Sequence, residues 1–154
     1  TVRSRLKGEK FKICGIWRLG HAEPPESLIV VLVGSVLEIL SLFPTSKARG
    51  RTILWTGASV PVYFITTSEA AWGATTLFYT GPYQLKRRLC IEARLQGLKL
   101  NADGLWQGKV RIAGKTERQI FKCLGIPYIP PKERRERWNE ARCSDVEKRS
   151  FSCN

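Results

Sequence analysis

LIVVLVGSVLEILSLF, residues 28–43, is the most apolar stretch of the sequence and predicts a strand followed by a helix. Residues 28–33 are aliphatic without interruption over the length of a strand, which is typical of a strand covered on both faces. From Ser35 to Leu42 the apolar residues follow helical spacing, and Pro44 ends the helix. The whole stretch is shorter than the roughly 20 residues that span a bilayer. We therefore expect a buried strand and an amphipathic helix instead of a membrane segment.

Further elements are predicted on both sides of this stretch. Alternating or β-branched segments predict strands at residues 11–16, 52–55, 60–66, 98–101, 105–106 and 109–112. Helical spacing predicts helices at about residues 70–78, at 83–96 before Gly97, and at 117–124 with Thr116 as N-cap. This order indicates an α+β fold, with a mixed sheet of four or five strands followed by a small three-stranded sheet.

The charge of the chain is strongly positive and unevenly spread. Its 154 residues include 26 Lys and Arg against 13 Asp and Glu, a formal net charge of +13. Residues 1–18 hold six basic residues against one acidic, residues 19–85 three against four, and residues 86–122 ten against three. A folded basic protein favours polyanionic partners, of which nucleic acid comes first and an anionic membrane surface or an acidic protein second.

The second cationic segment contains the candidate nucleic-acid-binding residues. They are Lys86, Arg87, Arg88, Arg94, Lys99, Lys109, Arg111, Lys115 and Arg118. The helix and hairpin strands that carry them are consecutive and must pack together, so we expect them to form one phosphate-binding face. The alternative for the run at residues 86–88 is a solvated helix face.

The cysteines and the histidine give no metal site. Five cysteines are odd in number, widely spaced and without a C-x-x-C pair, which favours free thiols over a disulfide scaffold. This predicts an intracellular, reducing compartment, an organelle or virion included. His21 has no cysteine within four residues, so we expect no structural zinc. The sequence has no Met, which fits removal of an initiator or cleavage of a precursor.

One apparent phosphate-loop motif is rejected on spacing. Residues 108–116, GKVRIAGKT, end in the GKT of such a loop, but five residues separate the glycines where the motif requires four. The intervening residues alternate as a strand does. We expect no ATP or GTP hydrolysis here.

The second half carries several ordered motifs of a known family. In order, these are LFYTG at residues 77–81, GLKLNADGL at 97–105, KTERQIF at 115–121 and LGIPYIPPKER at 124–134. The series resembles the end of the palm and the thumb of family X DNA polymerases. The resemblance implies a palm-like nucleotidyltransferase core at residues 1–82 and a basic helix with a thumb-like subdomain at 83–134. A tail at 135–154, expected to be helical, would follow.

The first half resembles the same family more weakly. Residues 14–20, CGIWRLG, fall where the family has a glycine-serine turn that holds the nucleotide triphosphate. Ile16 replaces the serine, and Leu19 replaces an arginine. The resemblance implies that six residues are remnants of the nucleotide pocket: Gly15, Arg18, Gly20, Phe78, Tyr79 and Gly81. For Phe78 and Tyr79 a place in the core is favoured over a place in a sugar-binding pocket, and core positions are expected for Trp17 and Trp72.

The catalytic aspartates of the family have no counterparts here. The resemblance places them at Glu26, Leu28 and Tyr63, and the whole sequence has two aspartates, both after the palm-like half. Two Mg²⁺ ions need clustered carboxylates to activate a 3′-hydroxyl and neutralise the transferring phosphate. Leucine has no oxygen ligand, and a phenol is a poor one. We therefore expect vestigial positions with no catalytic residue, no metal and no cofactor.

Two functions remain open at this point. The first is a catalytically degenerate polymerase-like protein that binds DNA or RNA inside a larger nucleoprotein assembly, such as a ribosome-like particle or a virion. The second is an active minimal DNA polymerase that uses Mg²⁺ with unusual ligands. The missing aspartates favour the first. Other protein subunits are expected to dock through the tail, and no membrane partner is expected.

Overall fold

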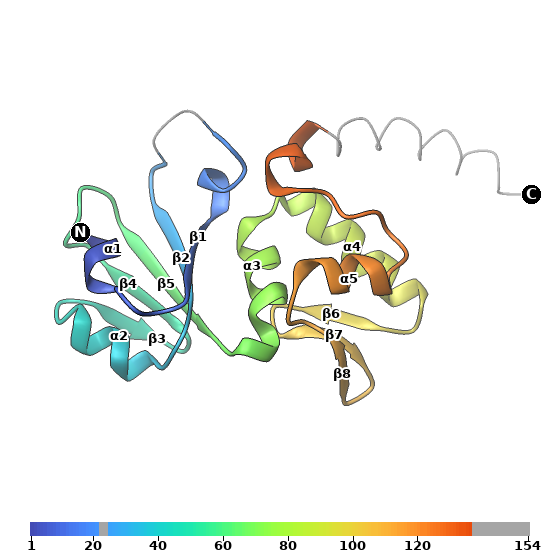
Figure 1. Ribbon diagram of the computed structural model, residues 1–154, viewed down its shortest axis with the longest axis horizontal. Helices are drawn as coiled ribbons and strands as arrows, with labels where there is room; N and C mark the ends of the chain where they lie inside the picture. Colours follow the sequence, from blue (N-terminus) through green and yellow to red (C-terminus); the bar gives the residue numbers. More distant parts are fainter. Residues whose placement is uncertain (22–24, 137–154) are drawn as a thin grey trace, which may run out of the picture.

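The computed structural model describes residues 1–21 and 25–136, which form two lobes joined by one helix (Figure 1). The first lobe contains α1 (Val2–Arg5), β1 (Phe11–Cys14), the 3-10 turn η1 (Gly15–Trp17), β2 (Leu28–Val33), α2 (Val36–Leu42), β3 (Lys47–Arg49), β4 (Thr52–Trp55) and β5 (Val62–Thr67). The turn η2 (Glu69–Ala71) then leads into α3 (Trp72–Thr80). The second lobe contains α4 (Tyr83–Leu95), β6 (Lys99–Asn101), β7 (Gly104–Gln107), β8 (Val110–Ala113), α5 (Glu117–Cys123) and η3 (Pro131–Glu133).

The first lobe is a five-stranded mixed sheet in the order β1-β2-β5-β4-β3. The pair β2–β5 is parallel, and the other neighbouring pairs are antiparallel. The central strand is therefore β5, and β1 and β3 are the edges. The helix α2 packs on one face, and α3 contacts β1 and β2 on the other.

The strand β2 shows why residues 28–33 are apolar without interruption. Val30 and Leu32 point into a core cluster that includes Phe43 of the α2 side, whereas Val31 points into a second cluster with Ile65 under α3. All three β2 residues are at most 1% exposed. Burial of an aliphatic side chain of this size contributes about 1.5–3 kcal/mol, so both faces of the strand stabilise the lobe.

The helix α2 begins and ends where local chemistry predicts. The Ser35 hydroxyl accepts a hydrogen bond from the Glu38 backbone N–H, and the Glu38 carboxylate accepts one from the Ser35 N–H. This capping box satisfies two amide donors at the helix start. Pro44 follows the last residues of the helix and cannot continue it.

The second lobe has its own core. Leu85, Leu89 and Ala93, spaced four residues apart on α4, are buried as the sequence predicts, together with Leu105 of the small sheet and Phe121 of α5. The three-stranded sheet has the order β6-β7-β8 with both pairs antiparallel. The predicted α+β class is confirmed: the mixed sheet, predicted with four or five strands, has five, and the three-stranded sheet is separate from it.

Several local predictions need correction. The first predicted strand ends at Cys14 because Gly15 has a positive φ of 71° and begins a 3-10 turn. The edge strand β3 was not predicted, since all of its residues are exposed and carry no apolar pattern. Trp17 is 48% exposed and is not a core residue. Within the described ranges no helix could cross a membrane. Most of the tail predicted at 135–154 lies outside the described residues.

Candidate functional site

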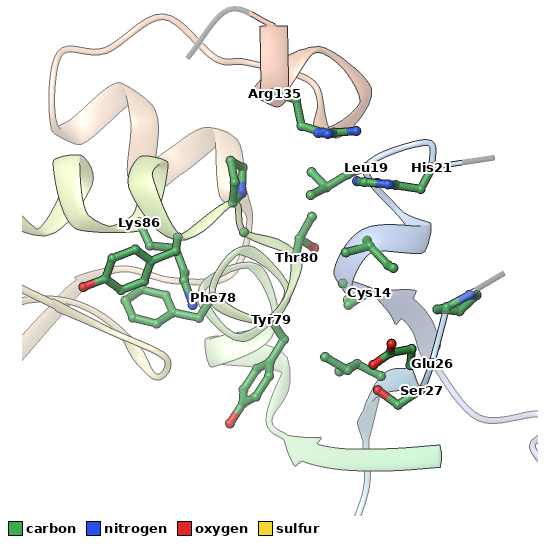
Figure 2. Close-up of a pocket in the computed structure, with 17 residues that line it drawn as sticks. Cys14, Leu19, His21, Glu26, Ser27, Phe78, Tyr79, Thr80, Lys86 and Arg135 are labelled. Carbon is green, nitrogen blue, oxygen red and sulfur yellow. The ribbon is translucent and has the colours of Figure 1, made fainter. Parts of the chain in front are cut away.

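An open cleft of about 770 Å³ lies between the lobes (Figure 2). The end of β1, η1 and the start of β2 form one wall, and the end of α3 with the start of α4 forms the other. Its polar and aromatic lining residues include His21, Glu26, Ser27, Phe78, Tyr79, Tyr83, Lys86 and Arg135. Of the predicted pocket remnants, Gly15, Phe78, Tyr79 and Gly81 line the cleft.

The cleft offers few ligands for a hard cation. Among its described lining residues Glu26 is the one carboxylate, and Figure 2 shows it beside Ser27, across the cleft from Phe78 and Lys86. Within residues 1–21 and 25–136 no three His, Cys, Asp or Glu side chains gather in a way that could hold a metal ion. A pair of Mg²⁺ ions needs several anionic oxygens, so this donor set does not fit them.

The strand register gives the faces of two of the three positions to which the resemblance assigns the aspartates, Leu28 and Tyr63. Ile29 pairs with Tyr63 across the parallel β2–β5 ladder, whereas Leu28 pairs with Val62. Residues that pair in register lie on the same face, so Leu28 and Tyr63 project from opposite faces of the sheet. Leu28 packs against the core on the α2 side. Leu28 and Tyr63 thus lie on adjacent strands, as the notion of a vestigial site requires, but on opposite faces, and on the α3 side β2 presents Ile29 beside Tyr63.

The turn after β1 depends on two glycines. Gly15 and Gly20 have positive φ angles of 71° and 82°, which residues with a side chain rarely adopt. A Cβ at Gly15 would also lie 3.4 Å from Cδ1 of Ile29. The two glycines therefore shape a tight turn over the start of β2, and this turn carries Arg18 toward α3.

Arg18 points away from the cleft lining into a buried ion-pair network. Its guanidinium donates to both carboxylate oxygens of Glu117, at 2.5 and 3.2 Å, and to the Thr80 hydroxyl at 2.7 Å. Arg134 donates to Glu117 Oε2 at 2.6 Å and to the Ile129 carbonyl at 3.0 Å. Glu117 is 7% exposed and Arg134 is fully buried. We call these three residues, Arg18, Glu117 and Arg134, the interlobe triad.

The interlobe triad holds Glu117 in its charged form. Burial opposes ionisation, but the hydrogen bond from Arg18 and the charge of Arg134 outweigh it, so that the pKa of Glu117 lies below its ordinary value. The hydroxyls of Thr76 and Tyr128 also donate to this carboxylate, at 3.3 and 3.4 Å. Burial, followed by the charge of Arg18, lowers the pKa of neighbouring Lys12. Arg18 is thus committed to an interlobe contact.

The two aromatic residues of the predicted turn have different environments. Tyr79 packs against the cluster of Cys14, Val31 and Ile65 on the sheet. Phe78 packs against the core of the second lobe, with Lys86 Nζ 5.7 Å from its ring centroid. Both are partly buried, so they combine a core contact with a place in the cleft.

The candidate nucleic-acid-binding residues come from successive elements of the second lobe. Exposed members are Arg87, Arg94, Lys99, Lys109, Arg111, Lys115 and Arg118, whereas Lys86 and Arg88 are partly buried. Two arginines are held by aromatic rings, Arg111 over Trp106 at 4.8 Å and Arg118 over Tyr128 at 4.1 Å. The helix α4 packs directly on β6. That all nine share one face stays a prediction.

Sequence reasoning missed Glu117 and Arg134 as partners of Arg18. Glu117 follows the N-cap Thr116, where an acidic residue is explained by the helix start alone. Its partner Arg18 is 99 positions away along the chain. The pairing has no local signal.

Comparison with known families agrees with the second lobe. Residues 75–135 match the family model of the DNA polymerase beta thumb, from the middle of α3 to just after η3. No curated protein matches the chain. The match supports a relationship to family X-like polymerases and to nucleic-acid binding for this part of the chain.

Proposed function

We propose that this protein binds nucleic acid through its thumb-like lobe without catalysing nucleotidyl transfer, as a structural component of a larger nucleoprotein assembly. The observation that carries the proposal is the combination of a polymerase beta thumb match with a cleft whose described lining residues include one carboxylate. A polymerase site works by positioning and by charge neutralisation.

Backbone binding is supported by the charge of the second lobe. Seven of its nine candidate cations are exposed, and they lie on α4, on the β6–β8 sheet with its turns, and on α5. Phosphate contacts of this kind position a strand without reading its sequence. We therefore expect little sequence preference in this site.

Absence of transfer chemistry is supported by the cleft itself. The register places Ile29 and Tyr63 side by side on the α3 side of β2 and β5, and neither is a carboxylate. The one arginine of the predicted triphosphate turn is bound to Glu117. Docking of further subunits through residues 135–154 belongs to the same proposal.

The salt dependence of binding tests the nucleic-acid interface. If about six cations each neutralise a phosphate, the logarithm of the affinity falls with the logarithm of salt at a slope of about −4 on a single strand and about −5 on a duplex. Arg87 and Arg94 are both exposed and lie two turns apart on one side of α4. Their joint replacement by Ala is expected to reduce the slope on duplex DNA by about 1.8.

A variant of equal charge change is the control. Arg3 and Lys7 are exposed cations of the first lobe, and their joint replacement by Ala lowers the net charge by the same amount. We expect this variant to keep the wild-type slope within about 0.5. An equal effect of the two variants, or no binding at low salt, would overturn the proposed interface.

A further inference from the structure

Among the described residues, the α3 side of the five-stranded sheet is covered over β1 and β2 and exposed at Tyr63 and at the edge strand β3. Across the strands, one row on this side runs Ile29, Tyr63, Leu54 and Lys47, as the ladder pairs show. The next row ends with Thr52 and Arg49. The helix α3 covers the β1 and β2 half, where Trp72 packs over the buried cluster, whereas α2 lies on the opposite face.

The uncovered half combines an aromatic ring with two cations. Tyr63 is 36% exposed on the central strand, and Lys47 and Arg49 are exposed on the edge strand β3. Within the described part of the chain these three side chains form no hydrogen bond, ion pair or ring contact. Tyr63 therefore offers an exposed ring on the same face of the sheet as two exposed cations.

We propose that this half of the sheet face, with Tyr63 at its centre and Lys47 and Arg49 at its edge, binds single-stranded nucleic acid. One base stacks on Tyr63, and the phosphates of neighbouring nucleotides contact Lys47 and Arg49. The proposal rests on the nucleic-acid binding proposed above and adds a site that contacts bases to one that contacts phosphates.

The geometry suits a single strand better than a duplex. Two strand spacings, about 10 Å, separate Tyr63 from Lys47, and the long lysine side chain extends this reach. Only an unpaired base exposes its flat face for stacking on a tyrosine, and stacking tolerates every base. Cations beside aromatic side chains on a sheet are a recurring arrangement for this ligand.

A substitution series at Tyr63 on two probes tests the proposal. The probes are a fluorescent oligothymidine and the same strand with abasic sites in place of the thymines. Tyr63→Ala is expected to weaken binding of oligothymidine about fivefold to tenfold, at the lower end of the effect of one stacked base, and to leave the abasic strand unchanged. Tyr63→Phe keeps the ring and is expected to bind within about twofold of the wild type. An equal loss on both strands, or none on either, would overturn the proposal.

Two further measurements make the result independent of folding and of the thumb-like lobe. Replacement of Lys47 and Arg49 by Ala is expected to reduce the salt slope on the oligothymidine by about 1.4. A strand carrying 5-iodouracil, irradiated with the wild-type protein, is expected to crosslink to Tyr63, and crosslinks confined to the second lobe would refute the site. If the wild type binds but Tyr63→Ala has no effect, this inference fails alone. If the wild type binds no strand at low salt, the proposed function fails with it.

Discussion

Replacement of Glu117 by Gln removes the one anion of the interlobe triad and tests whether the triad joins the lobes. Glu117 Oε1 lies 2.5 Å from Arg18 Nη1, and Glu117 Oε2 lies 2.6 Å from Nη2 of the fully buried Arg134. The substitution leaves two guanidinium groups facing a neutral amide. Removing one partner of a buried ion pair costs about 3–5 kcal/mol. Among the described residues Arg134 Nη1 already has no hydrogen-bond partner, so little is placed there to replace the lost carboxylate.

Calorimetric melting measures this loss. For a chain of this length each kcal/mol corresponds to about 2–4 °C in Tm, so Glu117→Gln is expected to lower the Tm by about 6–20 °C. The control is Asp103→Asn, which breaks an exposed ion pair with Arg51 between the same two lobes, with side chains 41% and 49% exposed. Such pairs contribute about 0–1 kcal/mol, so a decrease of at most about 4 °C is expected. Equal shifts for the two variants would refute the assigned role of the triad.

Two other predictions concern the same interface. The pKa of folded Glu117 is below its ordinary value of 4.5, so the ionised carboxylate stabilises the fold above that pH, and this stabilisation is lost as the pH falls through the folded-state pKa. Below pH 5 the wild-type Tm is therefore expected to fall more steeply than the Tm of Glu117→Gln. Parallel profiles of Tm against pH would contradict this. A Cβ at Gly73 of α3 would lie 2.2 Å from the backbone carbonyl carbon of Thr116. Gly73→Ala is therefore expected to lower the free energy of unfolding, measured in urea, by about 1–3 kcal/mol despite the better helix propensity of Ala. A stabilised variant would show that α3 and α5 are not in close contact.

The elements that could be predicted are those with local signals. The apolar run of β2, the capping box of α2 and the spacing of Leu85, Leu89 and Ala93 each depend on residues close together in the chain. The strand β3 has no such signal, because its residues are exposed and it is held only by pairing with β4. The strand β3 is therefore determined by its pairing partner in the folded chain and not by its own residues.

The candidate site was predictable only in part, for a related reason. Motif spacing located the turn around Gly15 and the residues of α3, which line the cleft. Spacing alone did not give the face on which each residue of β2 points, and a shift of one residue exchanges the faces of a strand. The resemblance therefore assigned aspartate positions to Leu28 and Tyr63, although the residue of β2 that pairs with Tyr63 is Ile29. The ion pair between Arg18 and Glu117 depends on how the two lobes pack together, and no local sequence pattern predicts that packing.

Primer extension by the bound complex tests the central claim most directly. A primed template is saturated with protein, with occupancy measured by anisotropy in the same buffer, and is incubated with nucleotides in Mg²⁺ and, separately, in Mn²⁺. We predict full occupancy and no extended primer, because the described cleft has the single carboxylate of Glu26. Nucleotide incorporation that disappears in Glu26→Gln would contradict the account and would identify an active polymerase with unusual metal ligands.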